Sequence, residues 1–255
     1  MDRHTVKKWL KRLAVGMAVT VGFLLVVGVI VDHGDTSNEV KTGGYRIPDD
    51  PAEGIRTSGV LIEPDPMLEI LDSIEVKGRA PKTGYRRSNF GRPWTDRVDV
   101  EFGHNGCSTR DDILRRDLHD VTLDNKGCRV MSGVLHDPYT DRDIAVDRGE
   151  GTAILIQVDH VVPLKDAWQK GAQNWDEAKR TQFANDPLNL LAVGHQVNKA
   201  KRDADIATWL PPNRGFWCEY VSRVVEVKAR YGVWMTQAEH DKATDILNDC
   251  AVSGN

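Results

Sequence analysis

The pattern of hydrophobic and polar residues divides the chain near residue 31. Residues 13–31 form 19 consecutive positions without a charged side chain, and most of them are Val, Leu, Ala or Gly. A helix of this length approaches the roughly 30 Å hydrocarbon thickness of a membrane. Lys11 and Arg12 precede the run and Asp32 follows it, so we expect the N-terminus to stay in the cytoplasm. The pattern predicts a transmembrane signal anchor, and a cleaved signal peptide stays open as the alternative.

The remaining chain is predicted to consist of a linker and one domain. Residues 1–12 form a basic cytoplasmic stub, and residues 32–66 are rich in Asp, Glu, Gly, Pro, Ser and Thr, as flexible linkers are. Apolar residues with helical spacing begin at Met67. We therefore expect a folded domain over residues 67–255, on the outer side of the membrane.

Periodicity within this domain predicts a mixed α+β fold. Alternation over 153–158 places Ile154, Ile156 and Val158 on one face of a strand. The turn sequence D-P-Y-T at 137–140 predicts a hairpin. Thr236 and Glu239 form a capping box at the start of a helix. Further helices are predicted to start at Met67 and to span 109–118 and 216–231, and the helix that the capping box starts is predicted to reach residue 248. The strands of the predicted hairpin are 130–135 and 144–146.

Composition excludes several classes of protein but does not identify the function. The 255 residues include 34 basic and 38 acidic side chains, a net charge of −4, with 40% hydrophobic and 28% charged residues. These values exclude a fully disordered chain, a collagen and a polytopic membrane protein. Residues 77–97, however, carry seven basic side chains and one acidic one, a local net charge of +6. Because Tyr85, Phe90 and Trp94 are interleaved with them, this segment suits nucleic-acid binding. A solvated charged surface is the alternative.

The four cysteines are predicted to form two disulfides because an exported chain meets an oxidising environment. Cys218 and Cys250 lie at the adjacent ends of two helices that a short connection makes antiparallel, which pairs them with each other. Cys107 and Cys128 then form the second bond. A cysteine zinc site is disfavoured because the sequence contains no Cys-x-x-Cys.

The candidate chemistry begins where the predicted strand over 153–158 ends. Asp159 and His160 follow it directly, and Asn198 and Lys201 occupy an apparent helix. Hydrolysis of a phosphodiester needs a base for water, a cation for the leaving oxygen and positive charge for the phosphate. His160 can be the base, Asp159 and Asn198 offer the oxygen ligands that Mg²⁺ accepts, and Lys201 can face the phosphate.

Seven ordered sequence blocks resemble the HNH, or ββα-metal, nucleases, and above all the exported actinobacterial HNH family proteins related to the C-terminal part of GmrSD restriction enzymes. The blocks are F-G-R-P-W (90–94), N-G-C-S-T-R-D-D-I-L-R-R-D-L (105–118), S-G-V-L-H-D-P-Y-T (132–140), V-D-H-V-V-P-L (158–164), N-D-P-L-N-L (185–190), N-K-A-K-R-D (198–203) and W-L-P-P-N-R (209–214). This resemblance implies an α+β fold, an HNH ββα-metal core with flanking helices.

The resemblance also implies roles for individual residues. Asp159 matches the first metal ligand, His160 the general base and Asn198 the last metal ligand. Asn189 matches the Asn that braces the loop carrying the base, and Lys201 matches a basic position after the last ligand. The family usually has Gly where this chain has Arg202.

We therefore expect a metal-dependent endonuclease that cuts DNA outside the cytoplasm with one Mg²⁺ or Mn²⁺ ion. RNA stays open as a substrate, and the sequence indicates no protein partner. Arg87 and Arg110 are candidate substrate contacts, although Arg110 could equally form a structural salt bridge. Two alternatives are a non-catalytic surface module that binds nucleic acid and a structural fold held by zinc.

Overall fold

The computed structural model of this protein describes residues 64–253. The predicted stub, the predicted anchor over 13–31 and the predicted linker up to residue 63 lie outside the described residues. None of the helices between residues 64 and 253 has the length and hydropathy of a membrane span.

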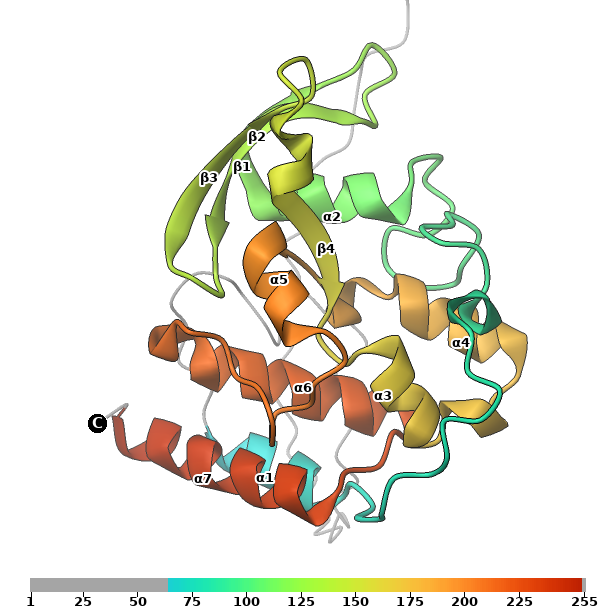
Figure 1. Cartoon of the computed structure of the whole chain (residues 1–255), viewed down its shortest axis with the longest axis vertical. Helices are drawn as coiled ribbons and strands as arrows, with labels where there is room; N and C mark the ends of the chain where they lie inside the picture. The colour runs from blue at the N-terminus through green and yellow to red at the C-terminus, as the bar shows by residue number, and fades with distance from the viewer. Residues whose placement is uncertain (1–63, 254–255) are drawn as a thin grey trace, which may run out of the picture. The chain divides into compact units, whose positions relative to one another are not determined.

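The described chain combines helices with two small antiparallel sheets, as the α+β prediction requires (Figure 1). The helices are α1 (Pro64–Asp72), α2 (Thr109–Asp117), α3 (Leu164–Gln169), α4 (Glu177–Asn185), α5 (His195–Lys201), α6 (Trp217–Tyr231) and α7 (Gln237–Ser253). The strands are β1 (Leu118–Leu123), β2 (Val130–Asp137), β3 (Arg142–Asp147), β4 (Ile156–His160) and β5 (Leu190–Gly194).

The first sheet has the order β1-β2-β3 and contains the predicted hairpin, β2 and β3, around the D-P-Y-T turn. Strand β1 was not predicted. Its pairing with β2 shifts register between His119 and Thr122, and Asp120 has a positive φ of 52°. This irregularity interrupts the period-2 alternation by which a strand is found in a sequence.

The second sheet is the pair β4-β5, in which His160 lies opposite Leu190. Helix α5 follows β5 directly and packs against both strands (Figure 1). Two antiparallel strands and a helix therefore form one unit, and the insertion between the strands contains α3 and α4. This arrangement brings the end of β4 and the helix α5 together.

The prediction of a strand starting at residue 153 was wrong. Residues Thr152–Leu155 form a 3-10 turn, η2, and β4 starts at Ile156. The hydroxyl of Thr152 accepts a hydrogen bond from the Asp147 amide (2.7 Å) and donates one to the Asp147 carbonyl (3.1 Å). These bonds tie the turn to the end of β3, so Ile154 is 69% exposed and does not share the buried face of Ile156 and Val158.

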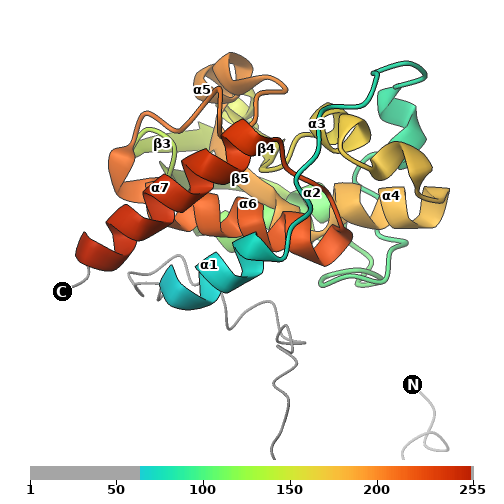
Figure 2. The ribbon, with the colours of Figure 1, turned by 90° about the horizontal axis from the view of Figure 1, so that it is seen from below.

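The main core lies around α6, which contacts both α1 and α7. Figure 2 shows these two helices beside α6. A second apolar cluster joins α2, the first sheet and the β4-β5 pair. Four tryptophans belong to the first cluster or pack against it: Trp168, Trp175, Trp209 and Trp217.

The predicted end of α6 and the predicted start of α7 are present, whereas α7 extends beyond residue 248 to Ser253. Gly232 ends α6 with a left-handed φ of 69°, which glycine adopts at little cost. Thr236 and Glu239 form the reciprocal capping box at the start of α7. Disulfides join Cys107 to Cys128 and Cys218 to Cys250, the two pairs that the sequence predicted.

Candidate active site

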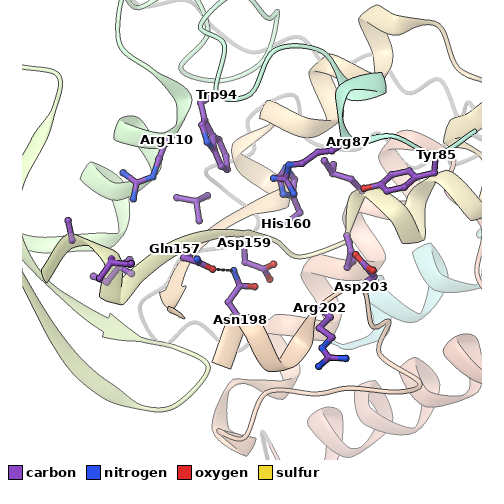
Figure 3. Close-up of a pocket in the computed structure, with 16 residues that line it drawn as sticks. Tyr85, Arg87, Trp94, Arg110, Gln157, Asp159, His160, Asn198, Arg202 and Asp203 are labelled. Carbon is purple, nitrogen blue, oxygen red and sulfur yellow. Dashed lines mark hydrogen bonds between the residues drawn. The ribbon is translucent and has the colours of Figure 1, made fainter. Parts of the chain in front are cut away.

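The end of β4 and the exposed side of α5 line one cavity of about 550 Å³. Asp159 and His160 enter it from β4, and Asn198 enters it from α5 (Figure 3). Arg87 and Trp94 line it from the basic segment 77–97, and Arg110 lines it from α2. The fold therefore brings an acid, an imidazole and an amide into one space with guanidinium groups.

Two buried side chains fix the carboxylate of Asp159. The Tyr139 hydroxyl donates a hydrogen bond to Oδ2 (2.8 Å), and the Lys201 ammonium donates one to the same oxygen (2.6 Å). Lys201 also bonds to the backbone oxygen of His160 (2.7 Å) and is 1% exposed. Because these two bonds use Oδ2, the other carboxylate oxygen is the one suited to a ligand in the cavity.

The position of Lys201 differs from the one expected for a phosphate contact. Its ammonium ties α5 to the end of β4 and compensates the charge of Asp159, and Lys201 is not among the residues that line the cavity. A phosphate contact from Lys201 stays a prediction. In this structure its direct contact is with the carboxylate.

The His160 ring is held in one tautomer. Its Nε2 lies 2.9 Å from the backbone oxygen of Ala184, and because a carbonyl only accepts, Nε2 carries the hydrogen. Nδ1 is then the nitrogen with the free lone pair. Burial lowers the pKa of His160 to about 3, and the charges of Arg87 and Lys201 act in the same direction. The imidazole is therefore neutral near pH 7, the state in which it can accept a proton.

Asn189 braces the chain that follows His160. Its Oδ1 accepts a hydrogen bond from the Val162 amide (2.8 Å), and its Nδ2 donates to the Val162 carbonyl (3.3 Å). The Val161 amide donates to the Asn189 backbone oxygen (2.9 Å). Asn189 is fully buried and its polar atoms bond to the backbone, so it holds the turn that follows His160.

Asn198 is oriented by a neighbour on β4. Its Nδ2 donates to the Oε1 atom of Gln157 (2.9 Å), which leaves the Asn198 Oδ1 as the acceptor available to the cavity (Figure 3). Together Asp159 and Asn198 offer one carboxylate and one amide oxygen, hard donors of the kind that Mg²⁺ and Mn²⁺ accept. This donor set fits a divalent cation whose remaining ligands are water and phosphate oxygens.

Three arginines provide positive charge around these groups: Arg87, Arg110 and Arg202 line the cavity. Among residues 64–253, no carboxylate lies within salt-bridge distance of Arg110, although the charge of Asp111 acts to raise its pKa. Burial and the nearby Arg148 lower the pKa of Arg110. An anion in the cavity would therefore stabilise the charged guanidinium of Arg110, which burial and Arg148 disfavour. Arg202 has a φ of 56°, a backbone region that favours the Gly usual at this position of the family.

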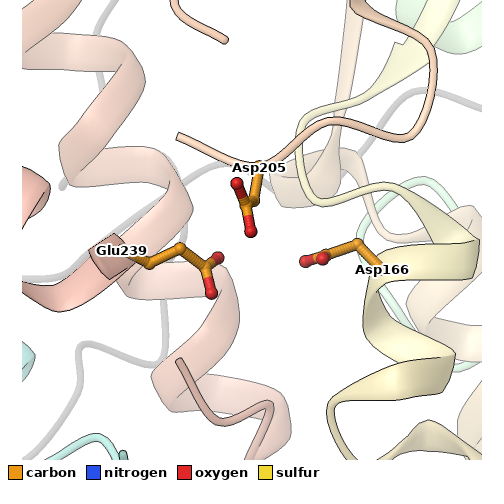
Figure 4. Close-up of side chains that lie close together, drawn as sticks. All are labelled: Asp166, Asp205 and Glu239. Carbon is orange, nitrogen blue, oxygen red and sulfur yellow. The ribbon is translucent and has the colours of Figure 1, made fainter. Parts of the chain in front are cut away.

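A second charged cluster lies outside this cavity (Figure 4). Carboxylate oxygens of Asp166, Asp205 and Glu239 approach within 4.8 Å of one another, close enough to hold a metal ion. The Lys170 ammonium, however, bonds to all three, at 2.6, 2.9 and 2.5 Å. Arg79 and Lys228 also pair with these acids. Three acids and three bases balance, so this is an internal ion network in which an ammonium stands where a metal would be.

Sequence patterns do not place Tyr139, Trp94 and Gln157 beside Asp159 and His160, although Trp94 is one of the aromatic residues of the basic segment 77–97. Tyr139 and Trp94 belong to two of the seven blocks, so their presence in the shared pattern was the available signal. Gln157 lies two positions before Asp159, and side chains two apart on a strand share a face. The contact of Trp94 with His160, whose ring centroids are 5.8 Å apart, had no local signal.

Comparison with known proteins identifies relatives of this chain. A family model described as "GmrSD restriction endonucleases, C-terminal domain" matches residues 108–245. A protein of Arthroderma benhamiae named "uncharacterized secreted protein" is 36% identical over 184 residues, which cover 71% of this chain and 83% of that protein. No solved structure matches the chain.

Proposed function

The chain belongs to the family of GmrSD restriction endonuclease C-terminal domains, and we propose that it is an HNH-type endonuclease that hydrolyses phosphodiester bonds of DNA. The observation that carries this proposal is the single cavity that contains Asp159, His160 and Asn198 together with three arginines. A nuclease needs a base, a cation site and phosphate contacts within one space, and these residues offer all three.

The proposed reaction is an in-line displacement at phosphorus. A water molecule loses a proton to Nδ1 of His160 as its oxygen forms the new bond to phosphorus. The bond from phosphorus to the 3′ oxygen breaks, and the leaving oxygen takes a proton from solvent. The products are a 5′ phosphate and a 3′ hydroxyl. The neutral tautomer set by Ala184 and the bracing of the following turn by Asn189 keep the base ready for this step.

We assign the cation site to Asp159 and Asn198, with Mg²⁺ or Mn²⁺ as the ion. When bound, such an ion supplies positive charge that stabilises the leaving oxygen. Tyr139 and Lys201 hold the carboxylate, and Gln157 holds the amide in the orientation that presents its oxygen. Arg87 and Arg110 contact the phosphates next to the scissile bond.

The proposed site of action is outside the cytoplasm. The name of the A. benhamiae relative describes a secreted protein, and the two disulfides of this chain suit an oxidising compartment. The apolar segment over 13–31 would deliver the domain across the membrane, as an anchor or as a cleaved signal peptide. Residues 67–255 would then form the exported nuclease domain.

A plasmid-nicking assay tests the proposal. Full-length protein produced in an oxidising compartment is incubated with supercoiled plasmid and Mg²⁺ or Mn²⁺. We expect nicked and linear products, no cleavage in EDTA and a loss of cleavage in His160→Ala. Cleavage that persists in His160→Ala would refute the assignment of the base. Retention of the plasmid without cleavage in either metal would favour the non-catalytic binding module.

A further inference from the structure

Two adjacent apolar side chains protrude beside the candidate active site. Ile154 is 69% exposed and Leu155 is 46% exposed, the two highest values for large hydrophobic residues in the described chain. Both lie on η2, directly before β4, and Ile154 lines the same cavity as His160. Full burial of one such side chain contributes roughly 1.5–3 kcal/mol to the free energy of unfolding. With Ile154 and Leu155 exposed, the fold lacks this contribution at two adjacent positions.

The turn that presents this pair is fixed at both ends. Thr152 is hydrogen-bonded to both backbone groups of Asp147, at the end of β3. Ile156, the first residue of β4, is 2% exposed and belongs to the second apolar cluster. Ile154 and Leu155 are therefore held outward by a rigid turn, which is how a protein positions a side chain for a partner.

The surroundings of the pair indicate what this partner is. The cavity beside Ile154 is lined by three arginines and two acids, Asp159 and Asp203. Asp203 is paired with Lys165, so the lining keeps an excess of positive charge that fits a polyanion. A stable protein interface buries about 800 Å² per partner, far more than two side chains can supply. Apolar side chains do, however, insert between neighbouring base pairs of DNA, where they contact the flat faces of the bases.

We propose that Ile154 and Leu155 form an apolar wedge that enters a base-pair step of double-stranded DNA while a phosphodiester a few base pairs away lies against Asp159 and His160. This inference rests on the proposed nuclease function and specifies its substrate as a stacked duplex. His160 lies six positions after Ile154, with two steps through the 3-10 turn at about 2 Å each and four along β4 at about 3.3 Å each, so the two residues are at most roughly 17 Å apart. At about 3.4 Å per base pair, the wedged step lies within about five base pairs of the cut.

The wedge would give the enzyme a weak sequence preference without hydrogen bonds to bases. Unstacking a step costs a few kcal/mol, and pyrimidine–purine steps such as TA and CA open most easily. We therefore expect cuts to be enriched at a fixed distance from such steps.

The test compares full-length wild type with the double variant Ile154→Ser/Leu155→Ser on duplex and single-stranded DNA of one sequence. We expect kcat/KM on duplex to fall by about tenfold and kcat/KM on single strands to change less than about twofold. The control is Leu123→Ser, which replaces another exposed leucine (37% exposed) on β1, outside the cavity lining, and should cleave both substrates as wild type does.

A binding experiment reports on unstacking directly. In the His160→Ala background, fluorescence of 2-aminopurine in the duplex should rise on binding, and the added serine substitutions should abolish the rise. Equal cleavage of duplex by wild type and the double variant would overturn the wedge, as would an equal loss on both substrates. Absence of cleavage by wild type would instead refute the proposed function, so the two failures are distinguishable.

Discussion

The indole of Trp94 lies nearly parallel to the imidazole of His160, with 5.8 Å between the ring centroids and 19° between the planes. Trp94 holds this position with a φ of 55°, which is uncommon for a bulky residue and costs about 1–3 kcal/mol. The side of the base that faces Trp94 is covered by a flat apolar ring, while Ala184 holds its Nε2. The strained backbone and the stacked ring together indicate that Trp94 positions the imidazole of His160.

Removal of this ring should reduce the rate of the chemical step. We expect Trp94→Ala to lower kcat by about tenfold with little change in KM, because the imidazole loses its fixed plane. Trp94→Phe keeps a flat ring and should recover part of the loss. The measurement is steady-state cleavage of a duplex, with thermal unfolding as the control for folding. A wild-type kcat in Trp94→Ala would show that the stacked ring does not position His160.

The buried imidazole predicts a pH-dependent stability. Between pH 6.5 and about 3, the unfolded chain binds a proton at His160 that the folded chain does not bind. The contribution of His160 to stability therefore falls as the pH falls. From about pH 7 to about pH 4, the stability of wild type relative to His160→Gln should decrease by an amount on the order of 3 kcal/mol.

Urea unfolding of both proteins across this pH range measures the effect. Since the two chains share every other titratable group, the difference between them isolates His160. A difference that stays constant with pH would mean that the folded His160 titrates normally, as an exposed histidine does.

Variants of Lys201 distinguish a structural role for this residue from a substrate-binding role. Its ammonium lies within 2.6 Å of Asp159 Oδ2, so Lys201→Met leaves a buried carboxylate without its partner. We expect a loss of about 3–5 kcal/mol in the free energy of unfolding. Lys199→Met, at an exposed position on the same helix, should change stability by less than about 0.5 kcal/mol.

The same pair of variants tests the predicted phosphate contact. If Lys201 binds phosphate instead, Lys201→Met will keep its stability but bind DNA more weakly and with a smaller dependence on salt. Chemical unfolding and a salt titration of DNA binding distinguish these results.

The hydrogen bond from Asn198 to Gln157 predicts a change in metal affinity. Gln157→Leu removes the acceptor that orients the amide, and partners of this kind commonly change metal affinity by about 10–100-fold. We expect the Mn²⁺ concentration for half-maximal cleavage to rise by about tenfold or more. Gln157→Glu keeps an acceptor of the same length and should retain wild-type or higher affinity. An unchanged metal requirement in Gln157→Leu would remove Asn198 from the cation site.

The local part of the candidate site was predictable from sequence, and its long-range contacts were not. Asp159 and His160 are neighbours at a strand end, a feature that alternation reveals. Tyr139 reaches Asp159 across 20 positions and from the turn between β2 and β3, a contact that local periodicity does not encode. Only the shared order of the seven blocks placed Tyr139 and Trp94 near this chemistry.

Elements of the fold were also predictable where the residues that form them are adjacent in sequence, and not where they depend on more distant contacts. Caps and turns at Thr236, Gly232 and the D-P-Y-T hairpin were found because each uses residues that are adjacent in sequence. The strand prediction over 153–158 failed where Thr152 bonds to Asp147 and imposes a 3-10 turn. Apolar residues do alternate over 153–158, but Ile154 lies in the 3-10 turn, where it is exposed at the cavity instead of buried in a strand.

The ion network around Lys170 limits how far the protein chain can be truncated. Residues 108–245, which match the family model, contain Asp166, Asp205 and Glu239 but omit Arg79. They also omit Cys107 and Cys250, the partners of Cys128 and Cys218. A fragment with those ends would bury carboxylates that have lost one of their cations and would leave one cysteine of each disulfide as a free thiol. A stably folded fragment therefore has to extend beyond the region of sequence similarity at both ends, so that it includes these three partners.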